Sequence, residues 1–181
     1  MPRVLSLFFL LLLAALPLSA QGVEPYSYDV GLLGGMGGSL DAEPDTGLTN
    51  SAFGAHALMV IERFTLVGVR AARIELDEDQ GFAPGLGKGQ LEYAALVGEY
   101  RYPKGFYDVG IYLGLGGYRV TGEFPDGEER SDTALGVAFG VTGEFELYRW
   151  LYLVADVNAH YAFLEDANLF GGALIGLGFR F

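Results

Sequence analysis

The sequence predicts an all-β protein, an eight-stranded antiparallel up-and-down transmembrane β-barrel, and three observations support this prediction. About half of the 181 residues are hydrophobic, yet beyond the first twenty no apolar run is long enough to cross a membrane as a helix. Eight segments alternate apolar with small or polar side chains, which is typical of strands that have two different faces. The connections between these segments alternate in length, as in a barrel with long loops at one rim and tight turns at the other.

Residues 1–20 have the features of a secretory signal peptide. Arg3 precedes an apolar run of thirteen residues, and small residues follow up to Ala20. The run is shorter than the roughly 20 residues that a membrane-spanning helix needs. We therefore expect cleavage within one or two residues of Ala20, export from the cytoplasm, and one barrel domain over residues 21–181. Cysteine is absent, which excludes disulfide bonds and thiolate metal sites.

The eight predicted strands are separated by turn signals, and their bounds follow the period-2 alternation. In the third, Arg70 in mid-strand marks the interior face, which leaves Val67 and Val69 outside. The fourth (Q-L-E-Y-A-A-L-V-G-E-Y-R-Y) alternates in either parity, so its facing stays open. The predicted strands cover residues 26–38, 52–62, 64–75, 90–102, 106–120, 133–147, 151–163 and 169–181.

The last four strands alternate most clearly. Each places large apolar side chains on one face and glycine, polar or charged side chains on the other, with few exceptions. The apolar faces are Val109, Ile111, Leu113 and Leu115 in the fifth strand, Leu135, Val137, Phe139 and Val141 in the sixth, Leu151, Leu153, Val157, Tyr161 and Phe163 in the seventh, and Leu169, Ala173, Ile175, Leu177, Phe179 and Phe181 in the eighth.

Long and short connections alternate along the chain. The long ones are residues 39–51, residues 76–89 and about a dozen residues that include Pro125-Asp126-Gly127. The short turns are at Glu62-Arg63, Pro103-Lys104-Gly105 and Tyr148-Arg149-Trp150, and aromatic side chains gather beside them as in an interfacial belt. The predicted belt consists of Tyr26, Tyr28, Phe64, Tyr102, Phe106, Tyr107, Tyr148, Trp150, Tyr152, Phe179 and Phe181.

The final strand ends on L-I-G-L-G-F-R-F, and with it the chain resembles the small eight-stranded outer-membrane barrels, the group that includes OmpX, OmpW and the transmembrane domain of OmpA. The resemblance covers the whole mature chain. It implies an outer-membrane location with both termini in the periplasm. It also implies that Ile175, Leu177, Phe179 and Phe181 form the C-terminal signal that the barrel-assembly machinery reads.

Charged side chains that face the lumen must pair or be hydrated, because eight strands leave no wide aqueous pore. Closing the barrel makes the first and last strands neighbours. We therefore expect Arg180 to meet Asp29, or to reach Glu144 or Glu146, as part of a structural plug. The expected interior polar network consists of Asp29, Arg70, Asp108, Glu144, Glu146, Asp156, His160 and Arg180.

The long loops are strongly acidic, with thirteen acids against Lys88 and Arg130, within a chain of net charge −12. The acids either solvate the loops, or share divalent cations with lipopolysaccharide phosphates or attract cationic ligands. Nucleic acid is excluded as a partner, because phosphate binding needs basic surface. The acids are Asp41, Glu43, Asp45, Asp77, Glu78, Asp79, Glu123, Asp126, Glu128, Glu129, Asp132, Glu165 and Asp166.

No catalytic constellation, metal site or cofactor motif is predicted. Asn158-Ala159-His160-Tyr161-Ala162 is similar to the His-x-Ser segment of the lipid A deacylase barrels, but Ala162 stands where the nucleophile would be. The sequence therefore predicts a non-enzymatic, monomeric outer-membrane barrel that serves envelope integrity or surface interaction through its acidic loops. The alternatives are a narrow channel for small solutes, a lipid-modifying barrel enzyme and a soluble lipocalin-like carrier.

Overall fold

The computed structural model describes residues 27–41, 47–48, 50–76, 89–104, 106–123, 129–164 and 169–181. The predicted signal peptide, Tyr26 and nine of the thirteen loop acids lie outside these residues, as does Lys88. The nine acids are Glu43, Asp45, Asp77, Glu78, Asp79, Asp126, Glu128, Glu165 and Asp166.

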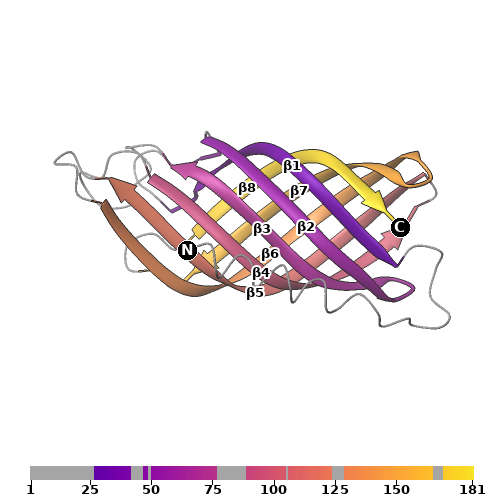
Figure 1. Cartoon of the computed structure of the whole chain (residues 1–181), viewed down its shortest axis with the longest axis horizontal. Helices are drawn as coiled ribbons and strands as arrows, with labels where there is room; N and C mark the ends of the chain where they lie inside the picture. Colours follow the sequence, from indigo (N-terminus) through magenta and orange to yellow (C-terminus); the bar gives the residue numbers. More distant parts are fainter. Residues whose placement is uncertain are drawn as a thin grey trace.

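The strands form one closed antiparallel barrel in which each strand pairs with the next along the chain (Figure 1). The barrel closes where β8 pairs with β1, with Asp29 opposite Arg180. Every strand of the barrel therefore pairs with a neighbour on both sides, and the sheet has no edge strand. The strands are β1 (Tyr28–Ser39), β2 (Asn50–Glu62), β3 (Thr65–Leu76), β4 (Gly89–Pro103), β5 (Tyr107–Glu123), β6 (Glu129–Tyr148), β7 (Leu151–Ala162) and β8 (Leu169–Arg180).

Two rims are distinguished by their connections. The terminal rim carries Ser27, Phe181 and the tight turns after β2, β4 and β6, and the Ser27 amide donates to the Phe181 carbonyl over 3.0 Å. The loop rim is the opposite end, where β1, β3, β5 and β7 end. Within the described ranges, no helix is long and apolar enough to cross a membrane.

The outer surface of the barrel is apolar. Leu32, Leu115 and Leu135 point outward and are 70% to 75% exposed. Such exposure over a whole barrel wall is unusual for a monomeric soluble protein, in which contiguous apolar patches are small. The exterior therefore matches the lipid-facing surface of a transmembrane barrel.

The lumen is divided into two layers. Near the loop rim it is filled by buried apolar and aromatic side chains, among them Ile74, Leu91, Tyr118, Val120 and Phe170, each 2% exposed or less. Towards the terminal rim it holds buried charged side chains. The interior is thus packed rather than open, as eight strands allow.

Strand β4, whose facing the sequence left open, points its odd-numbered side chains inward. Leu91, Tyr93, Glu99 and Arg101 are buried, whereas Leu96 is 69% exposed. Placing the charges of Glu99 and Arg101 on the apolar exterior would leave them without partners, which is costly. In the lumen each of them has a partner of opposite charge.

Strands β5 and β6 are longer than predicted, and the connection between them is shorter than the predicted dozen residues. Their ladder continues to the pair Glu123–Glu129, so only residues 124–128 separate the two strands. Alternation persists through this extension: Val120 and Gly122 are buried and Glu123 is exposed. Three acids predicted to lie in the loop, Glu123, Glu129 and Asp132, are therefore strand residues.

Aromatic side chains surround the terminal rim on the outside. Trp150 stacks on Phe179 with ring centroids 5.8 Å apart, and Tyr28 lies 5.9 Å from Phe181. Tyr152 was predicted for this belt, and that prediction is wrong. Its side chain points into the lumen and is 7% exposed, because Leu151 and Leu153 occupy the outward parity of β7.

Candidate functional site

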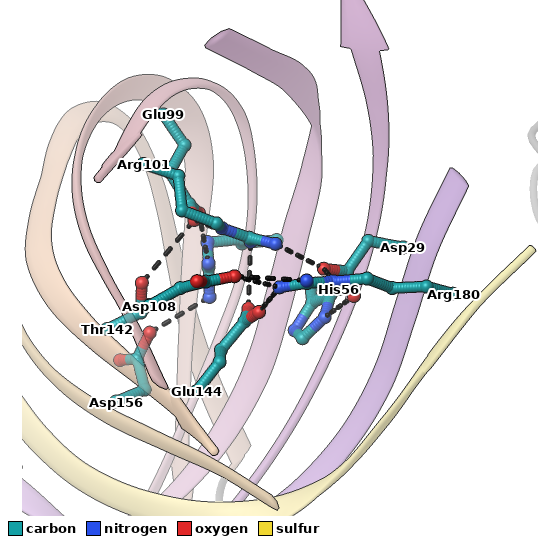
Figure 2. Close-up of polar contacts among 10 residues, drawn as sticks. Asp29, His56, Glu99, Arg101, Asp108, Thr142, Glu144, Asp156 and Arg180 are labelled. Atoms are coloured by element: carbon teal, nitrogen blue, oxygen red, sulfur yellow. Dashed lines mark hydrogen bonds and ion pairs between the residues drawn. The ribbon is translucent and has the colours of Figure 1, made fainter. Parts of the chain in front are cut away.

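The candidate site is the ionic layer of the lumen, which is centred on Arg101 of β4 (Figure 2). The Arg101 guanidinium lies 2.6 Å from a carboxylate oxygen of Glu99, 2.6 Å from one of Asp29 and 2.8 Å from one of Glu144. These partners come from β4, β1 and β6. One side chain therefore joins three strands across the lumen.

Arg180, at the end of β8, joins the same carboxylates from the terminal side. Its guanidinium lies 3.2 Å from Asp29 Oδ2 and 3.0 Å from Asp108 Oδ2, and it also contacts Glu144. Its Cζ lies 3.8 Å from the centre of the Tyr152 ring, a cation–π geometry. Arg180 thus closes the ionic layer at the terminal rim.

Arg70 of β3 extends the network towards the loop rim. It donates to Glu99 Oε2 over 2.5 Å and to Asp156 Oδ2 over 2.9 Å, and its Cζ lies 4.2 Å from the centre of the Tyr112 ring. Asp156 also accepts from Tyr112 over 3.2 Å. The guanidinium is therefore held between two carboxylates and one aromatic face.

A chain of polar side chains continues from Asp156 into the apolar layer. Asn158 donates to Asp156, and its amide oxygen lies 3.0 Å from His160 Nε2. His160 Nδ1 lies 3.1 Å from the Tyr118 hydroxyl, and the Tyr93 ring packs 4.1 Å from the imidazole. Both imidazole nitrogens therefore have partners.

Three guanidinium groups face five carboxylates in this layer, so the negative groups are in excess. His56 lies next to one of these carboxylates, with its Nε2 3.0 Å from Asp29 Oδ1. Charge–charge attraction is strong where water is excluded, but each ion also loses its hydration. The network is stable only as a set, because removing one member leaves its partners buried and unpaired.

Glycines on neighbouring strands make the room that the interior side chains occupy. A Cβ added at Gly31 would lie 2.4 Å from the His56 ring, and one at Gly140 would lie 2.6 Å from the Tyr112 ring. A Cβ at Gly110 would lie 2.3 Å from Thr142 Oγ1 and 2.6 Å from Glu99 Oε1. These glycines are thus part of the site, although they carry no functional group.

Comparison with known proteins identifies structural neighbours only. No protein-family model and no curated protein matches the chain. The Neisserial surface protein A structure is similar with a TM-score of 0.69 and 13% identity, covering 85% of this chain and 97% of that one. A major outer membrane protein of Thermus thermophilus is similar with a TM-score of 0.63 and 16% identity, covering 87% and 100%.

A third neighbour is the N-terminal barrel domain of Pseudomonas aeruginosa OprF, with a TM-score of 0.60 and 13% identity, covering 86% of this chain and 98% of that one. The chain has the fold of the small eight-stranded outer-membrane barrels. The all-β up-and-down barrel that the sequence predicted is thereby confirmed.

The structure brings seven of the eight predicted interior residues into one connected set: Asp29, Arg70, Asp108, Glu144, Asp156, His160 and Arg180. Glu146 differs from the prediction, because its side chain is exposed. It lies at the terminal rim beside the irregular pairing between Glu146 and Tyr148, where β6 leaves the regular ladder. Water therefore solvates a carboxylate that strand parity alone would place inside.

Sequence reasoning missed three charged or titratable members of the network: His56, Glu99 and Arg101. Their neighbours Tyr112, Thr142 and Asn158 were also not predicted as members. A signal was present in β4, because Glu99 and Arg101 share one parity while Tyr100 and Tyr102 share the other. A charged pair on one face of a spanning strand indicates the lumen, which would have settled the facing of β4.

The C-terminal residues of the predicted assembly signal all face outward. Ile175 is 56% exposed, Leu177 43%, Phe179 39% and Phe181 61%. They lie on the outer face of the closing strand, where another protein or lipid can contact them directly.

Proposed function

We propose that this protein is a non-enzymatic integral outer-membrane barrel whose lumen is closed by the ionic network. The observation that carries the proposal is the polarity of the wall: leucines are exposed outside, and ion pairs are buried inside. A soluble carrier of the lipocalin type needs the opposite arrangement, with apolar side chains inside and polar ones outside.

Extraction tests the membrane assignment. The mature chain should remain with outer membranes in salt and alkaline washes, dissolve in detergent, and migrate faster on a gel when it is left unheated. Release into buffer without detergent, with the fold retained, would overturn the proposal.

The surface role is proposed for the loop rim. The sequence places thirteen acids in or beside the loops, and among the described ones Glu123, Glu129 and Asp132 extend on β5 and β6. Two structural neighbours are named as a Neisserial surface protein and as the attachment invasion locus protein of Yersinia pestis, the latter with a TM-score of 0.56 and 17% identity. These names support a role at the cell surface.

Envelope integrity is proposed to involve divalent cations shared between loop carboxylates and lipopolysaccharide phosphates. Among the described residues, no group of three or more His, Asp or Glu side chains is arranged to hold a metal ion alone. The lipid phosphates would complete the coordination. Calcium should therefore raise the unfolding temperature in micelles that contain lipopolysaccharide, and equal unfolding temperatures with calcium and with chelator would contradict the bridge.

A further inference from the structure

The apolar wall of the barrel differs in height between two strands on opposite sides. Strands β3 and β7 are four strands apart in the closed order of eight, so their outer faces point in opposite directions. Each begins directly after a tight turn at the terminal rim, β3 at Thr65 and β7 at Leu151. Their outward side chains can therefore be compared from the same starting level.

On β3 the outward side chains are apolar only as far as Ala71. The next two outward residues are Arg73 and Glu75, and both are exposed. Arg73 follows Thr65 by eight residues, which is about 27 Å along the strand and about 21 Å along the membrane normal at a strand tilt of about 40°. Arg73 can extend its guanidinium towards water, but Glu75 directly above it ends the apolar wall.

On β7 the wall is taller. Across residues 151–163, all of which the structure describes, no charged side chain faces outward, and Phe163 at the upper end is 65% exposed. Phe163 follows Leu151 by twelve residues, which is about 41 Å along the strand and about 31 Å along the membrane normal at the same tilt. The outward side chains of β8 beside it are also uncharged, from Leu169 to Phe179.

Aromatic side chains fix the lower edge of the wall on both sides. Phe64 lies beside the start of β3, with its ring 6.1 Å from that of Tyr100, and Trp150 lies beside the start of β7. Such rings favour the head-group level, so they hold the terminal rim at one depth. Tilting the whole barrel would move one set of rings out of that level. The difference in height, about 10 Å, therefore falls at the loop rim.

We infer that this protein thins the membrane locally beside β3, where the acyl chains of the outer leaflet end about 10 Å lower than beside β7. A bilayer of uniform thickness fits only one side: it either surrounds Arg73 and Glu75 with acyl chains or leaves Phe163 in water. Thinning of the bilayer is the usual response to a short apolar surface. The inference rests on the proposed membrane placement and requires no particular head group.

Spin labels at two matched positions test the inference, because the chain has no cysteine of its own. Ala71→Cys and Val157→Cys each place a label six residues after the first residue of its strand. Ala71 lies about 5 Å below Arg73, whereas Val157 lies about 16 Å below Phe163. Collision with oxygen and with a water-soluble nickel complex measures label depth in phosphatidylcholine vesicles. We expect the Ala71 label to lie about 10 Å closer to the head groups.

A double variant restores the missing height. Arg73→Leu with Glu75→Leu continues the apolar wall of β3 towards the loop rim, so the label at Ala71 should move at least about 5 Å deeper. Ser131→Leu with Thr133→Leu is the matched control, because both are exposed outward residues of β6 that lie above an already tall wall. The control should leave the depth of the Ala71 label unchanged.

Unheated gel migration reports whether each labelled variant is folded. Equal depths of the two labels in the otherwise wild-type chain would overturn the inference, as would an unchanged Ala71 label in the folded double-leucine variant. Failure of the membrane placement gives a different result, because both labels would then be as accessible to the nickel complex as a label in water.

Discussion

At the scale of single residues, Arg101 is the side chain on which the ionic layer depends. It contacts three carboxylates and its side chain is 7% exposed, whereas Arg180 is 14% exposed and lies at the rim. Removing either guanidinium leaves carboxylates buried without their partner. Because Arg101 is buried more deeply, its loss should be the more damaging.

Arg101→Met should lower the free energy of unfolding by about 3–5 kcal/mol, the usual cost of breaking a buried pair. Arg180→Ala should also lower the free energy of unfolding, but by less, because water can reach the carboxylates at the rim. Urea unfolding in lipid vesicles, followed by tryptophan fluorescence of Trp150, measures both. Arg149→Met, in an exposed turn, is the control, and an Arg101→Met shift no larger than the control would contradict the structural role.

A second residue-scale prediction concerns the glycines that make room for interior side chains. Gly31→Ala should destabilise the barrel by about 1–3 kcal/mol, because the new methyl group overlaps the His56 ring that Asp29 holds in place. Gly98→Ala is the matched control, since a Cβ there meets nothing within 4 Å and the smaller number of unfolded conformations favours folding. Equal unfolding midpoints for the two variants would refute the steric argument.

At the scale of strands, alternation predicted the eight strands in their correct order, and the clearest ones were those whose outer face is uniformly apolar. Strand β4 could not be assigned because it has alanines and leucines in both parities, and only the charged pair Glu99 and Arg101 distinguishes its faces. The sequence prediction ended β5 too early and began β6 too late, because the polar residues there resemble a loop. Hydrophobic alternation does not show how far two strands stay paired beyond the apolar wall, because that pairing depends on the tertiary structure.

The same limit applies to the candidate site. Parity identified most interior charges, but it does not say which of them meet, because partners such as Arg70 and Asp156 are 86 residues apart. It also misplaced Glu146, whose exposure depends on where the ladder ends. The alternation of a single strand therefore shows which charged residues face the lumen. Which of these residues form ion pairs depends on the curvature of the closed sheet.

The last strand carries the strand-scale prediction. Phe181→Ala should reduce the fraction of protein that reaches the folded, heat-modifiable form in cells, because the predicted signal for the barrel-assembly machinery loses its terminal aromatic. Phe163→Ala is a comparable control, since Phe163 is an outward aromatic, 65% exposed, outside the last strand. Pulse-labelling followed by unheated gels measures both. The assignment fails if the two variants assemble with equal yield.

At the scale of the whole molecule, the two layers of the lumen bear on permeability. The apolar layer near the loop rim and the ionic layer near the terminal rim both fill the interior with side chains. A narrow channel requires a continuous water path through both layers. We therefore expect no single-channel conductance from the wild type in planar bilayers at moderate voltage. Steady unitary currents that survive repeated purification would instead support the narrow channel.

The pairing of β1 with β8 has a consequence for how the molecule is made. The Asp29 carboxylate of β1 contacts His56 of β2, Arg101 of β4 and Arg180 of β8. Its contacts therefore join the first strand of the barrel to the last. Until the twelve-residue strand β8 has paired with β1, one side of the Asp29 carboxylate is exposed to water, and so are the charged groups around it. Dehydration of the lumen must therefore come late in biogenesis, and an insertion intermediate should carry water through the bilayer in the space that the mature protein fills with ion pairs.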